Sequence, residues 1–184
     1  MDKEFKIIAI TPERLFPGEA ERIVEILSTG QAMYVHIRKP GCTDPMVASL
    51  IRSIPENFHD RLRLHDCFGL LSHFRLGGVH LNSRNPFPPD EAISISKSCH
   101  SLEDLKEAPH YDYVTLSPVF DSISKPGYDS AFSLPELRPI LQDYGNVIAL
   151  GGVTPSKFAV LKEAGFAGAA LLGHFFPPLT FENN

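Results

Sequence analysis

His100 is the side chain of this sequence best suited to move a proton. It stands in the segment Ser98-Cys99-His100, directly after a run in which apolar and polar residues alternate. Imidazole titrates near neutral pH and can therefore act as a general acid or base. A single histidine serves equally well as a structural hydrogen-bonding group, so the residue type alone leaves both roles open.

Gly151-Gly152 and Gly173 are candidates for binding a phosphate. Each follows a short apolar run, and the first pair leads through Val153-Thr154-Pro155 into an amphipathic segment. Glycine lets a backbone approach an anion closely, and the first turn of a helix offers unpaired N–H groups. These glycines could also simply turn the chain, but the second glycine after a neighbouring run favours an anion site.

Other polar residues at the ends of apolar runs are candidates for contacting a substrate. His36 and Arg38 lie two residues apart and point to the same side of a strand, where Arg38 could bind a carboxylate or phosphate. Asp66 could hold Mg²⁺, although one carboxylate alone is weak support. Lys125, in a serine-rich segment, could bind a phosphate or diphosphate, or be a solvated surface lysine. Further candidates for substrate binding are Ser98, Ser122 and Ser124.

The elements that would position these residues alternate between strand-like and helical patterns. Boundary signals include Gly30 after one helix, Pro55 after the next, and Thr154-Pro155 before the last. A capping-box-like spacing from Ser101 to Asp104 predicts the start of another helix. The expected strands are 5–11, 33–38, 61–66, 78–82, 93–99, 113–119, 147–151 and 168–172. The expected helices are 19–29, 43 or 44 to 54, 68–75, one from 101, 134–144 and 155–164.

About eight strand–helix units with strands buried on both faces predict an α/β fold, a TIM (β/α)8 barrel. The chain of 184 residues is compact for this fold, and it contains one domain, 1–184. Pro177 and Pro178 interrupt the last helix, which we expect to be reduced. A doubly wound open sheet is the alternative. In a barrel the polar residues named above would share the rim at the carboxyl ends of the strands.

Composition excludes several classes of partner. A net charge of −5 gives no basic patch for nucleic acid, and no apolar run approaches the length that spans a membrane. The N-terminus carries acidic residues and no secretory signal. Three scattered cysteines fit neither a disulfide framework nor a zinc knuckle, so we expect free thiols and a cytoplasmic location. An exposed flank beside the reduced last helix would favour a homodimer.

Across nearly its whole length the chain resembles the thiamine phosphate synthase and TenI family. Each matching segment is a loose motif, but their order and spacing together are specific. The segments are Val35-His36-Ile37-Arg38, Gly78-Val79-His80-Leu81, 98–104, Asp112-Tyr113-Val114, Ser117-Pro118-Val119-Phe120, Ser124-Lys125, 148–155 and 164–168.

The resemblance to the synthase branch implies transfer of a pyrimidine diphosphate to thiazole phosphate, with Mg²⁺ as cofactor. That branch holds magnesium with two aspartates, of which Asp66 matches the first and Asn85 stands at the second. Its diphosphate-binding lysine after the second strand falls on Pro40, with Lys39 one place out of register. An amide in place of a carboxylate removes a charge from a magnesium site, and losing the lysine removes a cation from the leaving group. On the loop after the sixth strand, Ser122, Ser124 and Lys125 retain that branch's hydrogen-bonding and cationic character.

The resemblance to the TenI branch implies instead a thiazole tautomerase, which moves a proton on a thiazole carboxylate phosphate and needs no cofactor. This branch carries a histidine on the second strand, here His36, and a catalytic histidine matched by His100, although synthases also often carry the latter motif. We therefore expect a tautomerase, with His100 moving the proton, Arg38 holding the carboxylate and Gly151, Gly152 and Gly173 binding the phosphate. The alternatives are a working thiamine phosphate synthase and a non-catalytic binder of thiazole phosphate.

Overall fold

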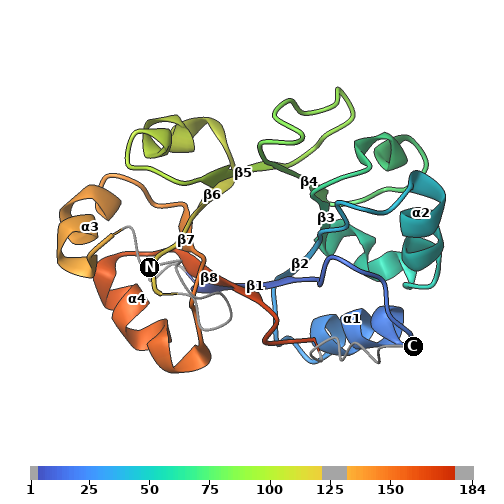
Figure 1. Cartoon of the computed structure of the whole chain (residues 1–184), viewed down its shortest axis with the longest axis horizontal. Helices are drawn as coiled ribbons and strands as arrows, with labels where there is room; N and C mark the ends of the chain where they lie inside the picture. The colour runs from blue at the N-terminus through green and yellow to red at the C-terminus, as the bar shows by residue number, and fades with distance from the viewer. Residues whose placement is uncertain (1–3, 122–131, 177–184) are drawn as a thin grey trace.

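A computed structural model describes residues 4–121 and 132–176 of the chain, and it contains a closed barrel of eight parallel strands. The strands follow one another around the barrel in sequence order, and β1 closes the ring by pairing with β8 (Figure 1). The strands are β1 Lys6–Ile10, β2 Tyr34–Ile37, β3 Leu62–Leu64, β4 Gly78–Leu81, β5 Ile95–Cys99, β6 Tyr113–Leu116, β7 Val147–Ala149 and β8 Gly168–Leu172. The predicted fold class is confirmed.

The helices surround the barrel and cover its outer face (Figure 1). The α-helices are α1 Glu19–Ser28, α2 Asp44–Arg52, α3 Leu134–Leu141 and α4 Phe158–Ala164. The 3₁₀ helices are η1 Glu56–Arg61, η2 Phe68–Ser72, η3 Asp104–His110 and η4 Pro155–Lys157. No helix is assigned between β4 and β5, or in residues 173–176 after β8, which is how this barrel stays compact. None of the described helices is long and apolar enough to cross a membrane.

Several predicted elements are shorter in the structure, for local reasons. The predicted helix from Ser101 is the 3₁₀ helix η3, which contains Pro109 and so lacks one N–H donor. Strand β6 ends at Leu116, shortly before Pro118, which cannot donate to the ladder. Strand β7 ends before Gly151, whose backbone has φ 91° and cannot continue a strand. The segment 68–75 forms only the short helix η2.

The inside of the barrel is apolar on one side and polar on the other. The apolar side comes from β1, β7 and β8 with the small buried cluster Ile8, Ile10, Ile148 and Ala170, which also includes Tyr113 of β6. TIM barrels usually fill their whole interior with branched apolar side chains. Here β2 to β5 instead contribute buried polar side chains: His36, Arg63, His65, His80 and Ser96.

Candidate functional site

His100 lies at the carboxyl end of β5, with its side chain exposed to solvent. Its ring Nδ1 lies 3.2 Å from the hydroxyl of Ser117 and 3.3 Å from the carbonyl oxygen of the same residue, which follows β6. Its backbone N–H donates to Asp104 Oδ2 at 2.7 Å. An accessible imidazole with an anchored backbone is suited to exchange protons with a bound molecule.

Ser101 and Asp104 form the reciprocal hydrogen bonds expected from the capping-box spacing, but helix η3 begins at Asp104 rather than at Ser101. The carboxylate of Asp104 accepts from the backbone N–H of His100 and of Ser101, and its own N–H donates to Ser101 Oγ at 3.1 Å. The hydrogen bond from the His100 N–H, helped by those from Ser101, lowers the pKa of Asp104. The charged carboxylate therefore fixes the turn that carries His100.

Gly151 and Gly152 form a tight turn next to the same rim. Both have positive φ, 91° and 60°, and a Cβ on Gly151 would lie 2.8 Å from Pro118 Cα. A Cβ on Gly152 would lie 2.3 Å from the carbonyl oxygen of Asp121. The close contact with Pro118, beside Ser117, brings the glycine turn and His100 to neighbouring positions along β5, β6 and β7. Gly173, with φ 84°, follows the adjacent strand β8.

The backbone amides of these glycines take no part in the hydrogen bonds between described backbone groups. Gly151, Gly152 and Gly173 donate no backbone hydrogen bond to any described residue. The carbonyl of Gly152 accepts from Lys157 Nζ at 2.7 Å, which places a cation beside the turn. Free amides and a nearby ammonium are the groups that bind phosphate in proteins.

The neighbours of the Asp66 carboxylate are N–H donors, from a guanidinium and from amides, rather than the second carboxylate that a magnesium site would need. Its Oδ1 accepts from Arg84 Nη2 at 3.0 Å and Nε at 3.2 Å, and from Asn85 Nδ2 at 3.2 Å. Its Oδ2 accepts from the backbone N–H of Lys39 at 3.1 Å. Mg²⁺ prefers oxygen ligands, and here the neighbours of the carboxylate are N–H donors. The residues present therefore do not fit a magnesium ion unless Arg84 and Asn85 move away.

Lys39 is buried inside the protein, so its ammonium group does not face a ligand at the rim. Its side chain is 1% exposed and its Nζ donates to Glu19 Oε1 at 2.6 Å, and to the carbonyls of Pro12 and Arg14 at 2.7 and 3.1 Å. Burial lowers the pKa of Lys39 and raises that of Glu19, and the mutual ion pair opposes both shifts. This lysine joins the loop after β1 to the end of β2, a structural role.

The other predicted substrate-binding residues divide between the rim and the interior. Arg38 lies at the rim and pairs with Glu13 at 2.6 Å, with side-chain exposures of 25% and 58%. His36 is fully buried inside the barrel. Ser98 lies at the inner edge, where its hydroxyl is 2.9 Å from His80 Nε2. Ser122, Ser124 and Lys125 lie outside the described residues.

A cluster of three buried histidines lies beneath the rim, and we call His36, His65 and His80 the histidine cluster. His36 Nδ1 lies 2.8 Å from His65 Nε2, and its Nε2 lies 2.6 Å from the hydroxyl of Tyr113. The rings of His65 and His80 stack with centroids 4.3 Å apart. Burial lowers the pKa of His36 and His65 well below the ordinary value and that of His80 to about 3, so all three are neutral at physiological pH.

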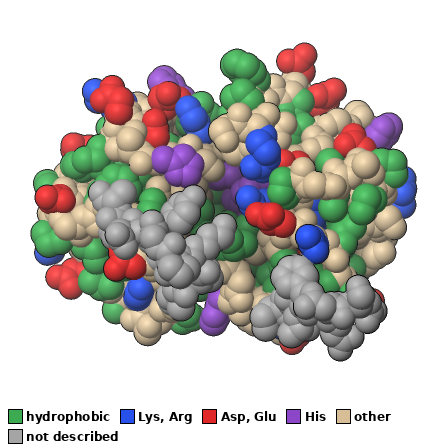
Figure 2. Space-filling model, in the orientation of Figure 1, with side chains coloured by type: hydrophobic (Ala, Val, Ile, Leu, Met, Phe, Trp, Pro, Cys, Tyr) green, Lys and Arg blue, Asp and Glu red, His purple; other side chains and the backbone are tan. Residues whose placement is uncertain are grey.

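Neither His65 nor His80 was predicted as a functional residue; His80 was noted only within the segment Gly78-Val79-His80-Leu81. Side chains two residues apart on a strand point to the same face, as Arg63 and His65 do, and as Ser96 and Ser98 do. This spacing is the sequence signal that could have placed such residues together in the barrel interior. Figure 2 shows Lys, Arg and His side chains gathered around the hollowed centre of the face that it presents.

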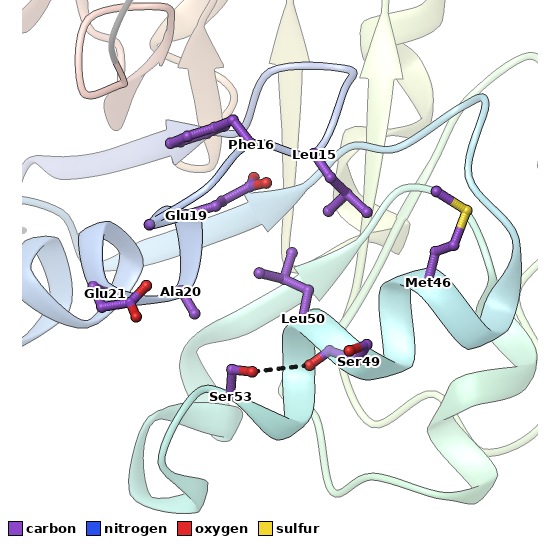
Figure 3. Close-up of a pocket in the computed structure, with 10 residues that line it drawn as sticks. Leu15, Phe16, Glu19, Ala20, Glu21, Met46, Ser49, Leu50 and Ser53 are labelled. Atoms are coloured by element: carbon purple, nitrogen blue, oxygen red, sulfur yellow. Dashed lines mark hydrogen bonds between the residues drawn. The ribbon is translucent and has the colours of Figure 1, made fainter.

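A surface hollow also lies away from the rim. A cavity of about 400 Å³ lies between α1 and α2, outside the barrel, and Figure 3 shows Phe16, Met46 and Leu50 lining it. Its walls carry Glu19 and Glu21 and no basic side chain. It therefore lacks groups that could hold an anion, and the rim remains the candidate site.

The fold and the rim define a compact (β/α)8-barrel protein with a glycine turn beside an accessible histidine. The chain belongs to the thiamine monophosphate synthase family, whose model matches residues 7–175. It is similar to the crystal structure of a thiamine phosphate pyrophosphorylase from Bacteroides thetaiotaomicron, with 34% identity, a TM-score of 0.84 and coverage of 98% of this chain and 90% of that one. The predicted family resemblance is confirmed.

A further relative agrees with this assignment, and a second solved structure shares the fold. A thiamine-phosphate synthase from Chlamydia caviae is 28% identical over 195 residues, covering 93% of this chain and 87% of the relative. A thiamine phosphate pyrophosphorylase from Pyrococcus furiosus is 22% identical with a TM-score of 0.74, covering 93% and 87% of the two chains, which shows the shared fold. The names of these relatives favour the synthase reaction over the tautomerase reaction.

Proposed function

We propose that this chain binds a phosphorylated thiazole at the barrel rim and moves a proton on it, as a thiazole tautomerase of the TenI branch. The observation that carries the proposal is the state of Asp66 and Lys39. Asp66 is neutralised by Arg84 and Lys39 is buried against Glu19. A reaction that expels diphosphate needs positive charge at the leaving group, whereas a proton shift does not.

The rim offers a group for each part of such a substrate. The amides of Gly151, Gly152 and Gly173 would receive the phosphate, with Lys157 close by. Arg38 would receive the carboxylate, which could replace the largely exposed carboxylate of Glu13. His100 would remove and return the proton, because its ring is accessible at the rim.

Thiamine phosphate synthase is the second candidate function. The names of the relatives support it, including the 34% identical structure that spans nearly the whole chain. In that reaction Asp66 would have to exchange Arg84 for Mg²⁺, and Ser122, Ser124 and Lys125 would contact phosphate groups.

One pair of assays separates the functions. Purified protein is incubated with the thiazole carboxylate phosphate tautomer, and aromatisation is followed for the wild type, His100→Ala and the control His110→Ala. We expect His100→Ala to lower the rate by about 10²- to 10⁴-fold, the usual contribution of a general acid–base residue. The control removes an exposed histidine at the end of η3 and should keep the wild-type rate.

The second assay supplies thiazole phosphate, pyrimidine diphosphate and Mg²⁺ and measures thiamine phosphate and diphosphate. Formation of both products at ordinary enzyme rates would overturn the tautomerase proposal in favour of the synthase. Activity in neither assay, together with a thermal shift by thiazole phosphate, would instead assign a non-catalytic binder.

A further inference from the structure

The polar half of the barrel interior has no role in the proposed proton transfer. Three of its members, His36, His65 and His80, each offer a ring nitrogen, and these three atoms lie within 4.8 Å of one another. All three side chains are almost completely buried, at 0, 5 and 1% exposure. We propose that the histidine cluster is a binding site for one transition-metal dication of the zinc type, separate from the rim.

The hydrogen-bond network shows which nitrogen of His80 carries the lone pair. Ser96 Oγ donates to the carbonyl of Val79 at 3.1 Å and must therefore accept from His80 Nδ1 at 2.8 Å. This bond assigns the proton of the neutral ring to Nδ1 and leaves a lone pair on Nε2. His80 Nε2 is therefore the candidate ligand atom of a ring that Ser96 orients, and its present contact with Ser98 Oγ, 2.9 Å, would give way to the metal.

His36 and His65 meet the same requirements after one proton changes place. His36 Nδ1 and His65 Nε2 lie 2.8 Å apart and share one hydrogen bond, in which one nitrogen carries the proton and the other accepts it. If His36 carries its proton on Nε2, it donates to the Tyr113 hydroxyl at 2.6 Å, and Nδ1 faces the cluster without a proton. His65 would likewise carry its proton on Nδ1. Outer hydrogen bonds of this kind orient the histidine ligands of metal sites.

The distances require only a small adjustment. With Zn–N bonds of about 2.0–2.1 Å, tetrahedral ligand nitrogens lie roughly 3.3 Å apart. The His36–His65 pair would open from 2.8 Å, and the third nitrogen would move inward from at most 4.8 Å. Three imidazoles leave a fourth position for water, as in zinc sites with an open coordination position.

A second observation points to a missing ligand at this place. The hydroxyl of Thr115 is completely buried and has no hydrogen-bond partner among the described residues. Thr115 pairs in register with Ser98, whose hydroxyl contacts His80 Nε2, and it lies two residues beyond Tyr113 on the same face of β6. An orphaned buried hydroxyl usually indicates an unseen water or ion, here a water on the metal.

The composition of the cluster selects the class of metal. The ligands are neutral imidazoles without a carboxylate, and the buried guanidinium of Arg63 lies two residues before His65. A hard ion such as Mg²⁺, which needs oxygen ligands and negative charge, does not suit this site. Zn²⁺, Co²⁺ and Ni²⁺ form strong bonds to imidazole nitrogen, and Zn²⁺ is the expected occupant.

The test uses the full chain without a histidine tag, after treatment with EDTA and dialysis. Titration with Zn²⁺ in a calorimeter should give one site per chain, and Co²⁺ should give the visible d–d bands of a four-coordinate nitrogen site. We expect His80→Gln to lower the Zn²⁺ affinity by more than about 100-fold. Ser96→Ala, which keeps every ligand, should lower it by about 10- to 100-fold. The matched control His59→Gln changes a buried histidine outside the cluster, bonded to the carbonyls of Ile51 and Ile54, and should leave the affinity unchanged.

A crystal soaked in Zn²⁺ gives a result that does not depend on variants. An anomalous peak between the three rings supports the proposal, while a peak only at surface residues overturns it. Failure of the wild type to bind Zn²⁺ and Co²⁺, or equal affinity in His80→Gln and the wild type, would also overturn it. Failure of this proposal is distinguishable from failure of the tautomerase proposal, because metal binding is measured directly and His100 is not one of the ligands.

Discussion

Replacing Lys39 by methionine should destabilise the protein far more than replacing a surface lysine. The change leaves the carboxylate of Glu19, 2% exposed, buried without its cation, and removes the donor from the carbonyls of Pro12 and Arg14. Breaking one side of a buried ion pair costs about 3–5 kcal/mol. For a chain of this length such a loss corresponds to a fall in melting temperature of roughly 6–20 °C.

The variant also changes how stability depends on pH. Burial already raises the pKa of Glu19, and the ion pair with Lys39 opposes that rise. In Lys39→Met the folded-state pKa of Glu19 rises further above its unfolded-state pKa. Between these two pKa values the carboxyl group is protonated in the folded state and ionised in the unfolded state. The penalty should therefore be small near pH 4.5 and should grow as the pH rises through the folded-state pKa.

Urea unfolding at pH 5 and pH 8 measures both effects. The control is Lys106→Met, which removes the cation from an ion pair with Glu103 whose side chains are 67% and 77% exposed, and which should change stability far less than Lys39→Met does. The double variant Lys39→Met/Glu19→Leu should recover much of the loss, because it leaves no unpaired charge. If Lys39→Met cost no more than Lys106→Met, the structural role assigned to this lysine would be refuted.

Three further predictions concern the rim and the thiols. Gly152→Ala should weaken binding of thiazole phosphate and lower stability more than Gly173→Ala, measured by calorimetry and urea unfolding, since an added Cβ meets Asp121 at 2.3 Å in the first and nothing within 4 Å in the second. Arg84→Ala should raise the affinity of the chain for Mg²⁺ by freeing Asp66, while Arg75→Ala should not; equal affinities would show that Arg84 does not block the carboxylate. Burial raises the pKa of Cys67 to about 12 and of Cys99 to about 11, so at pH 8 about one Cys67 thiol in ten thousand and one Cys99 thiol in a thousand is ionised. Alkylation by iodoacetamide, followed by mass spectrometry, should therefore be slow for both until the protein is unfolded.

The rim could be predicted from the sequence because it depends on chain order alone. In a barrel of parallel strands every strand ends at the same rim, so residues that follow apolar runs must lie there together. His100 and the glycines after β7 and β8 confirm that reasoning. The capping spacing of Ser101 and Asp104 could likewise be read locally, since both partners lie within one turn.

Which side chains face the barrel interior, and which charged residues form ion pairs, could not be predicted in the same way. Whether His36 faces a substrate or the barrel axis depends on which strands lie opposite, and Tyr113 of β6 reaches it across the barrel. The partner of Lys39 is 20 residues away, and no local pattern indicates that Glu19, at the start of an amphipathic helix, is buried. Such contacts depend on how the loops fold back over the strands.

The two residues that most affect the choice of reaction are both already paired within the protein. To bind magnesium diphosphate, the rim would have to give up the bonds from Arg84 to Asp66, and Lys39 would have to leave a buried carboxylate. Each step costs free energy before any ligand contact is made, and the loss of the second carboxylate at Asn85 leaves less metal binding to offset that cost. A proton shift on a bound thiazole phosphate requires neither rearrangement, because His100 is exposed at the rim and the glycine amides donate no backbone hydrogen bond to any described residue. The preference for the tautomerase reaction therefore depends on whether Arg84 leaves Asp66 when magnesium and diphosphate are present.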